Sequence, residues 1–403
     1  MGFTNLFILD TSLTDIAGHH FEYAKAVSEA AARRAVPTVV VCNLRATNAV
    51  KSTMKVVPVF HMGTYDRVLS WKWLPSLSKK LNTVLFIIRF LIDWWMMRMP
   101  ELISKETLVF VPTCAEGSVF GLIIWLKLLP SFKRPKVVCL FRYDPRGMMN
   151  FVARIMRGLV NEGVIILATD SDDLSRDYKV RTGLRFHVLP IPHIPVSVEK
   201  DFHFDRASKP IRLTYLGDAR IEKGLDTLLG AIHLLDQAIR ERRIEFVIQS
   251  SVFLATNGIG SVVEQLQKLE SEHEFGVKLI REPMDTRSYY ALLASSDVVV
   301  LPYRKAVYHS RTSGILVEAI AAGKPVIVSN GTWMASQVKQ HGSGMIIEED
   351  NASDLARAVQ TVAAKIDELR DQAEQKAVAW RARHNADRLL DTLLDLCERM
   401  PAN

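Results

Sequence analysis

Residues 308–329 hold the side chains and backbone groups of this chain that are best suited to chemistry. Their pattern predicts a loop, a short helix, a turn and a buried strand. Ser313 and Gly314 stand where the helix would begin, and the first amides of a helix have no intrahelical partner. The amides of Gly314, Ile315 and Leu316 would therefore form a partially positive site suited to phosphate.

Glu318 follows these amides by about one helical turn. A diphosphate held at the helix start would leave an attached ribose within reach of its carboxylate, so a nucleoside diphosphate fits better than a bare phosphate. The same residues also fit a purely structural interpretation. In that interpretation Ser313 is an N-cap, Glu318 is a solvated helix residue, and Gly323-Lys324-Pro325 stops the helix. The spacing alone leaves both interpretations open.

This stretch resembles the donor-binding motif of the retaining nucleotide-sugar glycosyltransferases of glycosyltransferase family 4. The family motif has two glutamates separated by seven residues and then Ala-x-Ala-x-Gly-x-Pro-Val, and this chain matches it at Glu318-Ala319, Ala321, Gly323, Pro325 and Val326. Ser310 stands where the first glutamate would be. The resemblance assigns position 310 to the donor sugar and Glu318 to the ribose. It also implies an α/β chain of the GT-B fold, with two facing Rossmann-like domains.

A second stretch, residues 217–226, resembles the family motif Gly-Arg-x-x-x-Glu-Lys-Gly. Lys223 falls on the lysine of the motif, whereas Asp218 occupies the position of its arginine. Arg220, two residues further on, is then the expected source of the missing charge. Two cations would stabilise the charge that grows on a leaving diphosphate. The structural alternative is an exposed helix start rich in charged residues.

The first half of the chain begins with an apolar run at 3–9, a loop at 10–20, a helix at 21–34 and a strand at 37–42. This order predicts a parallel β-α-β unit. In the family the glycine-containing loop after the first strand approaches the donor diphosphate, and Gly18 is the matching position. An ordinary strand-to-helix turn is the alternative, and a catalytic base at His19 or His20 is a weaker hypothesis.

Arg142 directly follows the apolar run at 137–141. Ligands of parallel sheets bind at the carboxyl ends of the strands, so this position is expected to face a cleft. Many relatives carry a histidine near the donor sugar at the corresponding place. Arg142 would contact an acid sugar, a phosphate or an acceptor oxygen, or it would form a structural salt bridge with Asp144 or another carboxylate.

The length of 403 residues suits two domains. We expect an N-terminal Rossmann-like acceptor domain at 1–190 and a proline-rich linker at 191–210. A C-terminal nucleotide-sugar domain would follow at 211–375, and a helix at 376–403 would pack back on the first domain. The predicted strands are 108–112, 137–141 and 164–168 in the first half, and 211–216, 244–248, 277–280, 298–301, 325–328 and 345–347 in the second.

The four cysteines show no metal-ligand spacing, which predicts buried free thiols in a reducing cytosol. The apolar run at the N-terminus is too short for a signal peptide and is expected to be a strand. The acids at 169–173 suit the N-cap and first turn of a helix better than a metal site. We therefore expect a cytoplasmic protein.

Basic residues are concentrated between positions 67 and 136, where eleven Lys and Arg stand against four acids, and this excess of 11 − 4 = +7 equals that of the whole chain. No nucleic-acid-binding signature accompanies them, so an anionic membrane or acceptor is the more fitting partner. A membrane-contact region at 68–136 would contain the apolar helix expected at 81–99. Its Arg89 and Asp93 argue against a membrane span. Burial in the domain and contact with the membrane interface both remain open.

The resemblance, together with these observations, implies a retaining glycosyltransferase without a metal requirement. Its donor would be a nucleoside-diphosphate sugar, and its acceptor a glycan or lipid-linked hydroxyl at the inner face of the cell membrane. No nucleic acid is expected as a partner. The alternatives are a nucleotide-sugar-binding partner subunit with weak catalysis, for which Ser310 is the argument, and a GT-B-like isomerase of the nucleotide sugar.

Overall fold

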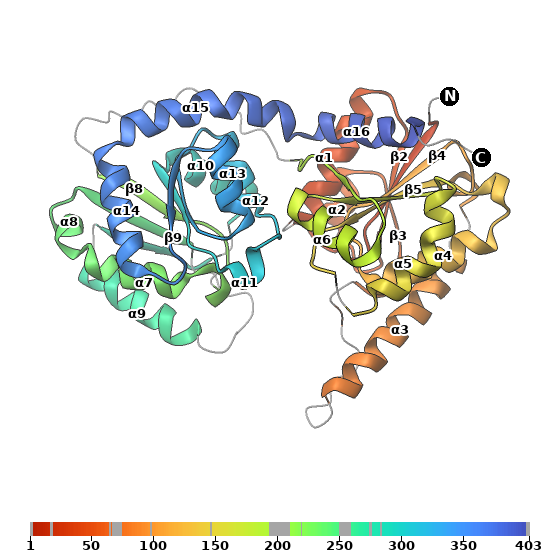
Figure 1. Cartoon of the computed structure of the whole chain (residues 1–403), viewed down its shortest axis with the longest axis horizontal. Coiled ribbons are helices and arrows are strands. Elements are labelled where there is room, and N and C mark those ends of the chain that lie inside the picture. The colour runs from red at the N-terminus through yellow and green to blue at the C-terminus, as the bar shows by residue number, and fades with distance from the viewer. Residues whose placement is uncertain are drawn as a thin grey trace. The chain divides into compact units, whose positions relative to one another are not determined.

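The computed structural model of the chain divides into two compact units (Figure 1). Unit 1 comprises Met1–Ile194 together with Asn385–Asn403, and unit 2 comprises Pro195–His384. The structure describes residues 3–16, 19–63, 66, 75–96, 99–145, 147–192, 210–218, 220–249, 259–273, 276–282 and 284–399. Gly18 and most of the expected linker, residues 193–209, lie outside these ranges.

Unit 1 contains a seven-stranded parallel sheet with the order β3-β2-β1-β4-β5-β6-β7. Apolar side chains dominate both faces of its central strands, as expected of a parallel sheet covered by helices on both sides. The strands are β1 Asn5–Leu9, β2 Thr38–Asn43, β3 Val56–Phe60, β4 Thr107–Val111, β5 Lys136–Phe141, β6 Ile165–Thr169 and β7 His187–Val188.

Two hydrophobic cores lie on opposite faces of this sheet, because successive strand residues point to opposite sides. Phe7 and Leu9 belong to one core, whereas Leu6 and Ile8 belong to the other. The first core also contains residues of α3 Pro75–Met96, α4 Glu116–Leu128, α5 Met149–Asn161 and α6 Asp172–Thr182. The second contains residues of α1 His19–Arg33, α2 Asn48–Thr53 and α16 Ala386–Arg399. Short 3₁₀ turns occupy η1 Pro100–Leu102 and η2 Ser131–Lys133.

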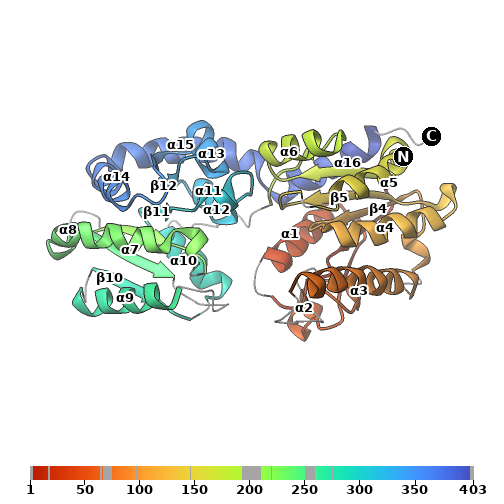
Figure 2. The ribbon, with the colours of Figure 1, turned by 60° about the horizontal axis from the view of Figure 1, so that its bottom comes forward.

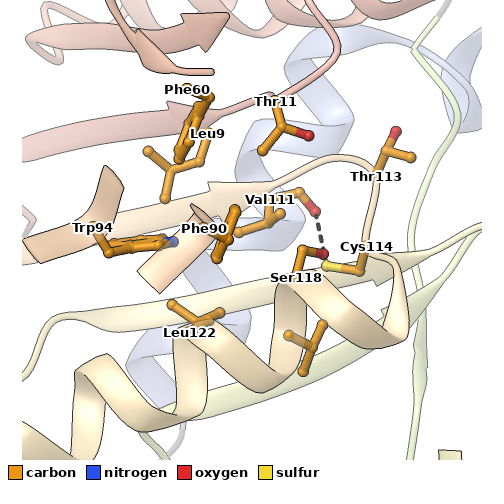
Figure 3. A pocket seen from close by; sticks show the side chains of 11 residues that line it. Leu9, Thr11, Phe60, Phe90, Trp94, Val111, Thr113, Cys114, Ser118 and Leu122 are labelled. Carbon is orange, nitrogen blue, oxygen red and sulfur yellow. Dashed lines mark hydrogen bonds between the residues drawn. The ribbon is translucent and has the colours of Figure 1, made fainter. Parts of the chain in front are cut away.

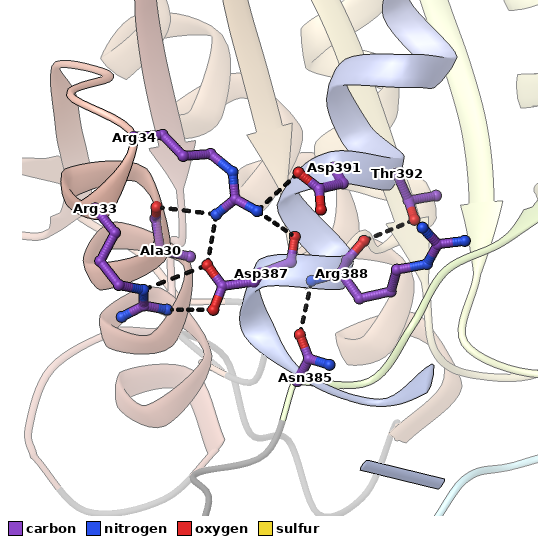
Figure 4. A network of polar contacts seen from close by, with 8 residues as sticks. All are labelled: Ala30, Arg33, Arg34, Asn385, Asp387, Arg388, Asp391 and Thr392. Carbon is purple, nitrogen blue, oxygen red and sulfur yellow. Dashed lines mark hydrogen bonds and ion pairs between the residues drawn. The ribbon is translucent and has the colours of Figure 1, made fainter. Parts of the chain in front are cut away.

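Helix α16 packs on α1 although more than 350 residues separate them in sequence (Figure 4). Arg33 and Arg34 both donate to the carboxylate of Asp387, at 2.8 and 2.5 Å, and Arg34 also pairs with Asp391 at 2.8 Å. Beneath these polar contacts the side chain of Leu393 is fully buried. Of the segment expected to pack back on unit 1, residues 376–383 belong instead to α15, which lies in unit 2.

Replacing Leu393 with Ala is expected to lower the free energy of unfolding of unit 1 by about 2–5 kcal/mol, because it removes a fully buried side chain and leaves a cavity. Asp387→Ala, which removes the ion pairs from a side chain that is 45% exposed, should cost no more than about 1 kcal/mol. Guanidinium unfolding followed by circular dichroism measures both. A larger loss for the aspartate variant would show that the ion pairs, and not the apolar contact, hold α16.

Unit 2 contains a six-stranded parallel sheet with the order β10-β9-β8-β11-β12-β13 and helices on both of its sides (Figures 1 and 2). The strands are β8 Ile211–Tyr215, β9 Ile244–Gln249, β10 Val277–Ile280, β11 Val298–Leu301, β12 Val326–Ser329 and β13 Gly344–Ile347. The helices are η3 Ile221–Lys223, α7 Leu225–Leu234, α8 Asp236–Arg240, α9 Ile259–Glu272, α10 Thr286–Ser295, α11 Lys305–Tyr308, α12 Gly314–Ala321, α13 Trp333–His341, α14 Ala352–Ala364 and α15 Ile366–Arg383.

The acidic stretch after β6 forms the start of α6, as the sequence predicts. Ser171 is the N-cap, and its hydroxyl accepts a hydrogen bond from the amide of Leu174 at 3.1 Å. Asp172 and Asp173 occupy the first helical turn, where they interact favourably with the helix dipole. In the part of the chain that the structure describes, no group of three or more His, Cys, Asp or Glu side chains is arranged to hold a metal ion.

Candidate functional site

The candidate site of unit 2 lies where the order of its strands reverses. Chain order runs outward from β8 through β9 to β10 on one side, and from β11 through β12 to β13 on the other. The crevice at the carboxyl ends of β8 and β11 is thus the topological switch point, which is the usual ligand site in such sheets. Gly217 follows β8 there, and Pro302 and Tyr303 follow β11.

Three segments meet at this crevice around Gly217. Its φ of 97° lies in the left-handed region that favours glycine. A Cβ atom at this position would lie 2.6 Å from the Nζ of Lys223 and 2.9 Å from the Cδ1 of Ile315. The loop after β8, the end of η3 and the start of α12 are therefore in direct contact. The structure thus brings together the two motifs that the sequence predicts to act jointly.

Lys223 is buried, with 8% of its surface exposed. Burial lowers the pKa of its ammonium group to about 8, and the positive charges of Arg220 and Arg311 act in the same direction, while Asp218 opposes them. Its Nζ also lies 5.7 Å from the centre of the Tyr303 ring. A desolvated cation among like charges is poised to gain from an anionic ligand.

Arg220 lies in the same cluster and is held by acids on both sides. It donates to Asp218 at 2.6 Å and lies 3.7 Å from Glu222. Burial lowers the pKa of Arg220, but the hydrogen bond with Asp218 and the negative charges of Asp218 and Glu222 act together in the opposite direction, and the net shift is upward. Asp218, the residue that departs from the family motif, therefore orients Arg220, the arginine expected to supply the missing charge.

Arg311 is a third cation of this cluster that the sequence analysis did not single out. Its guanidinium lies 5.5 Å from the centre of the Tyr308 ring, and its charge depresses the pKa of Lys223. The available signal was its position between Ser310 and Ser313, in the loop that leads into α12. Arg311 was not predicted because the family pattern has no fixed residue at this position.

The start of α12 has the expected N-cap, and this corrects one part of the predicted phosphate site. The hydroxyl of Ser313 accepts a hydrogen bond from the amide of Leu316 at 3.3 Å. The amide of Leu316 already donates to this cap. The amides expected to bind a phosphate are therefore those of Gly314 and Ile315. A Cβ atom on Gly314 would meet no atom within 4 Å, so the backbone at the helix start borders open space.

The far side of α12 is fixed by α15. The indole of Trp380 is buried and donates to the carbonyl of Val317 at 3.0 Å, and Arg381 donates to the carbonyl of Ala321 at 2.6 Å. A cation at the carboxyl end of a helix complements its dipole. These contacts hold the amide end of α12 in a fixed place against Gly217 and Lys223.

Glu318 lies on α12 and accepts a hydrogen bond from the hydroxyl of Tyr289 at 2.5 Å. Tyr289 belongs to α10, so this helix lies next to the carboxylate of Glu318. Ser310, in the position of the family's first glutamate, is only 1% exposed. A short, neutral and buried side chain therefore stands where the family pattern has a glutamate.

In unit 1, Arg142 follows β5 and forms a buried ion pair. Its Nε lies 3.1 Å from Asp170, which follows β6, and its guanidinium stacks 5.0 Å from the centre of the Tyr23 ring. Burial lowers the pKa of Arg142, but the Asp170 carboxylate, together with Tyr23 and Tyr143, acts in the opposite direction, and the net shift is upward. The sequence left open which carboxylate would form a structural salt bridge with Arg142. The structure shows that it is Asp170 and not Asp144.

A histidine and an aspartate meet at the carboxyl end of β1. The Nδ1 of His20 lies 2.7 Å from the carboxylate of Asp10, which is 3% exposed. His20 is one of the two histidines considered as a base, and the side chain of His19 lies outside the described residues. Asp10 was not predicted as a site residue, because it lies in the expected loop at 10–20 and its sequence position gives no sign of the contact with His20.

The switch point of unit 1 lies between β1 and β4, and a small apolar cavity occupies it (Figure 3). Its volume is about 10 Å³, which is about the volume that one water molecule requires. The rim carries the hydroxyls of Thr11 and Thr113, and the interior is lined by Phe60, Phe90 and Trp94. This cavity is too small for a sugar.

Comparisons with known proteins show which family model and which folds the chain resembles. Residues 198–380, which span most of unit 2, match the family model described as glycosyl transferases group 1. A search of curated proteins finds no match.

Among solved structures, a glycosyltransferase from Rickettsia africae is 13% identical, with a TM-score of 0.70 and 99% of each chain covered. Sucrose-phosphate synthase from Thermosynechococcus elongatus is 14% identical, with a TM-score of 0.67 and coverage of 98% and 99%. HepE from Anabaena, solved with UDP and glucose, is 14% identical, with a TM-score of 0.62 and coverage of 98% and 100%. The chain therefore has the GT-B fold, as expected.

Proposed function

We propose that the protein is a retaining glycosyltransferase of family 4 that moves a sugar from a nucleoside-diphosphate sugar to a hydroxyl of a glycan or lipid-linked acceptor. The observation that carries this proposal is the meeting of Lys223, Gly217 and Ile315 at the switch point of unit 2. It joins a buried cation to the amide end of a helix, which is the chemistry that a diphosphate requires.

In this proposal the diphosphate binds the amides of Gly314 and Ile315, with Lys223 and Arg220 as its cations. Glu318 accepts hydrogen bonds from the ribose hydroxyls at the place where it now accepts one from the Tyr289 hydroxyl. Ser310 is assigned to the sugar side. The match of residues 198–380 to group 1 glycosyltransferases supports this assignment. No metal ion is given a role, because side chains and amides neutralise the diphosphate.

The transfer step breaks the bond between the anomeric carbon and the diphosphate oxygen, and that oxygen keeps the electron pair. The acceptor oxygen forms its new bond to the anomeric carbon on the same face of the sugar. Its proton passes to the departing phosphate. Lys223, Arg220 and the two amides stabilise the negative charge that grows on the leaving group, and this is the catalytic contribution assigned to unit 2.

We also place the reaction in the cytoplasm and assign the acceptor to unit 1. All four cysteines are free and buried, which fits a reducing compartment. The excess of basic residues between positions 67 and 136 suits an anionic acceptor.

A panel of nucleotide sugars tests the proposal. Thermal unfolding with UDP-, GDP-, ADP- and dTDP-sugars should show stabilisation by one base series, because a ligand that binds only the folded state raises the melting temperature. Mass spectrometry of the same mixtures with candidate acceptors should then show transfer. The proposal fails if no nucleoside diphosphate stabilises the protein.

A second candidate is a subunit that binds the nucleotide sugar without turning it over. Ser310 favours it, because this residue replaces the glutamate that the resemblance assigns to the donor sugar. Stabilisation by a nucleotide sugar with no transfer to any acceptor, even with added membranes or partner proteins, would support this alternative.

The affinity for the nucleoside diphosphate should fall as pH rises above about 8, because the pKa of Lys223 in the free protein is about 8 and only the ammonium form attracts the diphosphate. The bound anion raises this pKa, so binding near pH 8.5 should take up a proton. Calorimetric titration with UDP and GDP in two buffers of different ionisation enthalpy measures this uptake. A proton release, or an affinity that is independent of pH between 7 and 9.5, would contradict the assignment.

The same lysine should affect the stability of the free protein in the opposite direction. Its pKa is lowered from 10.5 to about 8 on folding, so the unfolded chain holds more protons between these values. Stability linked to this group therefore rises with pH across that window. Comparison with Lys223→Met isolates its contribution from those of other groups.

A further inference from the structure

Helix α3 has an inner face that packs closely on α4. Phe86, Phe90 and Trp94 are buried on this face, and Trp94 lies 4.4 Å from Trp125 between ring centres. A Cβ atom on Gly121 would lie 2.6 Å from the Phe90 ring, so the small residue is what allows the two helices to approach. This face explains why α3 folds with unit 1.

The outer face of α3 exposes large apolar side chains. We name this surface the α3 outer face; it consists of Val84, Leu85, Ile88, Ile92 and Trp95, which are 38–72% exposed. Their spacing of three, four and seven residues places them on one side of the helix. Of the thirteen exposed large hydrophobic residues in the described part of the chain, five lie on this helix. Such a concentration on one helix marks an interaction surface.

The one acid of α3 is buried, and the sequence around this helix is basic. Asp93 is the only acid of α3 in the sequence, and it is 2% exposed and paired with Arg89 at 3.1 Å and His61 at 2.8 Å. Residues 67–98 contain six Lys and Arg and one acid, an excess of 6 − 1 = +5. Folding therefore removes the acid from the surface, while the segment keeps a strongly basic character.

We propose that the α3 outer face docks on the surface of an anionic lipid bilayer, with the helix lying in the plane of the interface. Apolar side chains would enter the boundary between headgroups and acyl chains, and the basic segment would meet the anionic phosphates. Trp95, at 72% exposed, is of the residue type enriched at that boundary. Within the described residues, no helix is long and apolar enough to cross a membrane, so the contact is peripheral.

A second copy of the chain is the competing occupant of this surface, and the charges disfavour it. A two-fold interface through the α3 outer face would bring two segments of +5 against each other. Like charges at an interface raise its free energy, whereas an anionic bilayer lowers the free energy of the same segment. The experiment below distinguishes a lipid bilayer from a second copy of the chain.

Flotation of the full chain with vesicles tests the proposal. The protein should float with vesicles of phosphatidylglycerol and phosphatidylcholine, float less in 0.5 M salt because charges are screened, and remain behind with phosphatidylcholine alone. The triple variant Ile88→Ser, Ile92→Ser, Trp95→Ser should lower the partition coefficient at least about tenfold, which corresponds to about 1.4 kcal/mol.

The control replaces three exposed apolar residues on other helices. Val180→Ser, Leu234→Ser, Val378→Ser changes side chains that are 82%, 57% and 64% exposed and should float within about twofold of the native chain. Circular dichroism and thermal unfolding show whether each variant is folded.

Three results would overturn the proposal: no flotation of the native chain, flotation of the α3 variant at the native level, or an equal loss in the control. Light scattering adds a fourth. A native dimer that becomes a monomer in the α3 variant, without vesicle binding, would assign the surface to a second copy. None of these measurements depends on the donor site, so the proposed function and this inference fail independently.

Discussion

Lys223→Ala is expected to lower the turnover number for sugar transfer by about a hundred- to a thousandfold, the loss typical of removing one group that stabilises transition-state charge. The Nζ of Lys223 lies next to Gly217 and Ile315, where we propose that the leaving diphosphate binds. Steady-state kinetics with the stabilising nucleotide sugar measures the change.

The fold should survive this substitution, because the protein already disfavours the charged form of Lys223. Its lowered pKa means that removing the ammonium relieves a desolvation cost. Lys223→Met keeps most of the aliphatic stem that packs near Tyr303 and should show the same loss of turnover with little change in melting temperature. Lys268→Met is the control for the loss of a lysine as such, because this side chain is 77% exposed. Transfer at the native rate by Lys223→Ala would show that the site is misplaced.

The second large effect is expected on stability, at Gly224. This residue has a φ of 69°, and a Cβ atom there would lie 1.9 Å from the carbonyl oxygen of Pro302. Neither atom is at the end of a flexible side chain, so the backbone after β11 would have to move. Gly224→Ala should therefore lower the free energy of unfolding of unit 2 by about 3 kcal/mol or more, through steric overlap and left-handed strain.

Guanidinium unfolding of Gly224→Ala, read at a signal specific to unit 2, measures this loss. Gly158→Ala, read at a signal specific to unit 1, is the control for a glycine-to-alanine change, because Gly158 lies in α5 and a Cβ atom there meets nothing within 4 Å. The control should raise stability slightly, since alanine is the better helix former by about 1 kcal/mol. If Gly224→Ala unfolds within about 0.5 kcal/mol of the native protein, the close approach of the two loops is not as described.

Much of the fold could be predicted because the parallel sheets are built from continuous apolar runs. Strands β10 and β11 have the predicted bounds, and most others differ by one or two residues. Strand β3 was missed, and Pro58 is the reason. Proline cannot donate to the hydrogen-bond ladder and argues against a strand, but β3 lies at the edge of its sheet, where a proline is tolerated. Helix α2 was missed because its six residues are too few to show a helical period.

The candidate site could be predicted only where a local motif carries it. Lys223 and the start of α12 were found because each belongs to a short pattern, whereas their contact at Gly217 depends on the order of the strands. The pairing of Arg142 with Asp170 was open for the same reason, since the partners follow neighbouring strands 28 residues apart. Helix α3 shows a further limit. An apolar helix can be buried or exposed, and only the packing on α4 shows which residues form each face.

The return of α16 to unit 1 has a consequence for how the chain folds during synthesis. The ribosome releases all of unit 2 before the last helix of unit 1 emerges. Until then, the apolar surface of α1 that α16 covers, opposite Leu389, Leu390, Leu393 and Cys397, has no neighbour from its own chain. A nascent chain stalled before residue 386 should therefore contain a stable second unit and an unfinished first unit, and chaperones that bind exposed apolar surface should recognise it at α1.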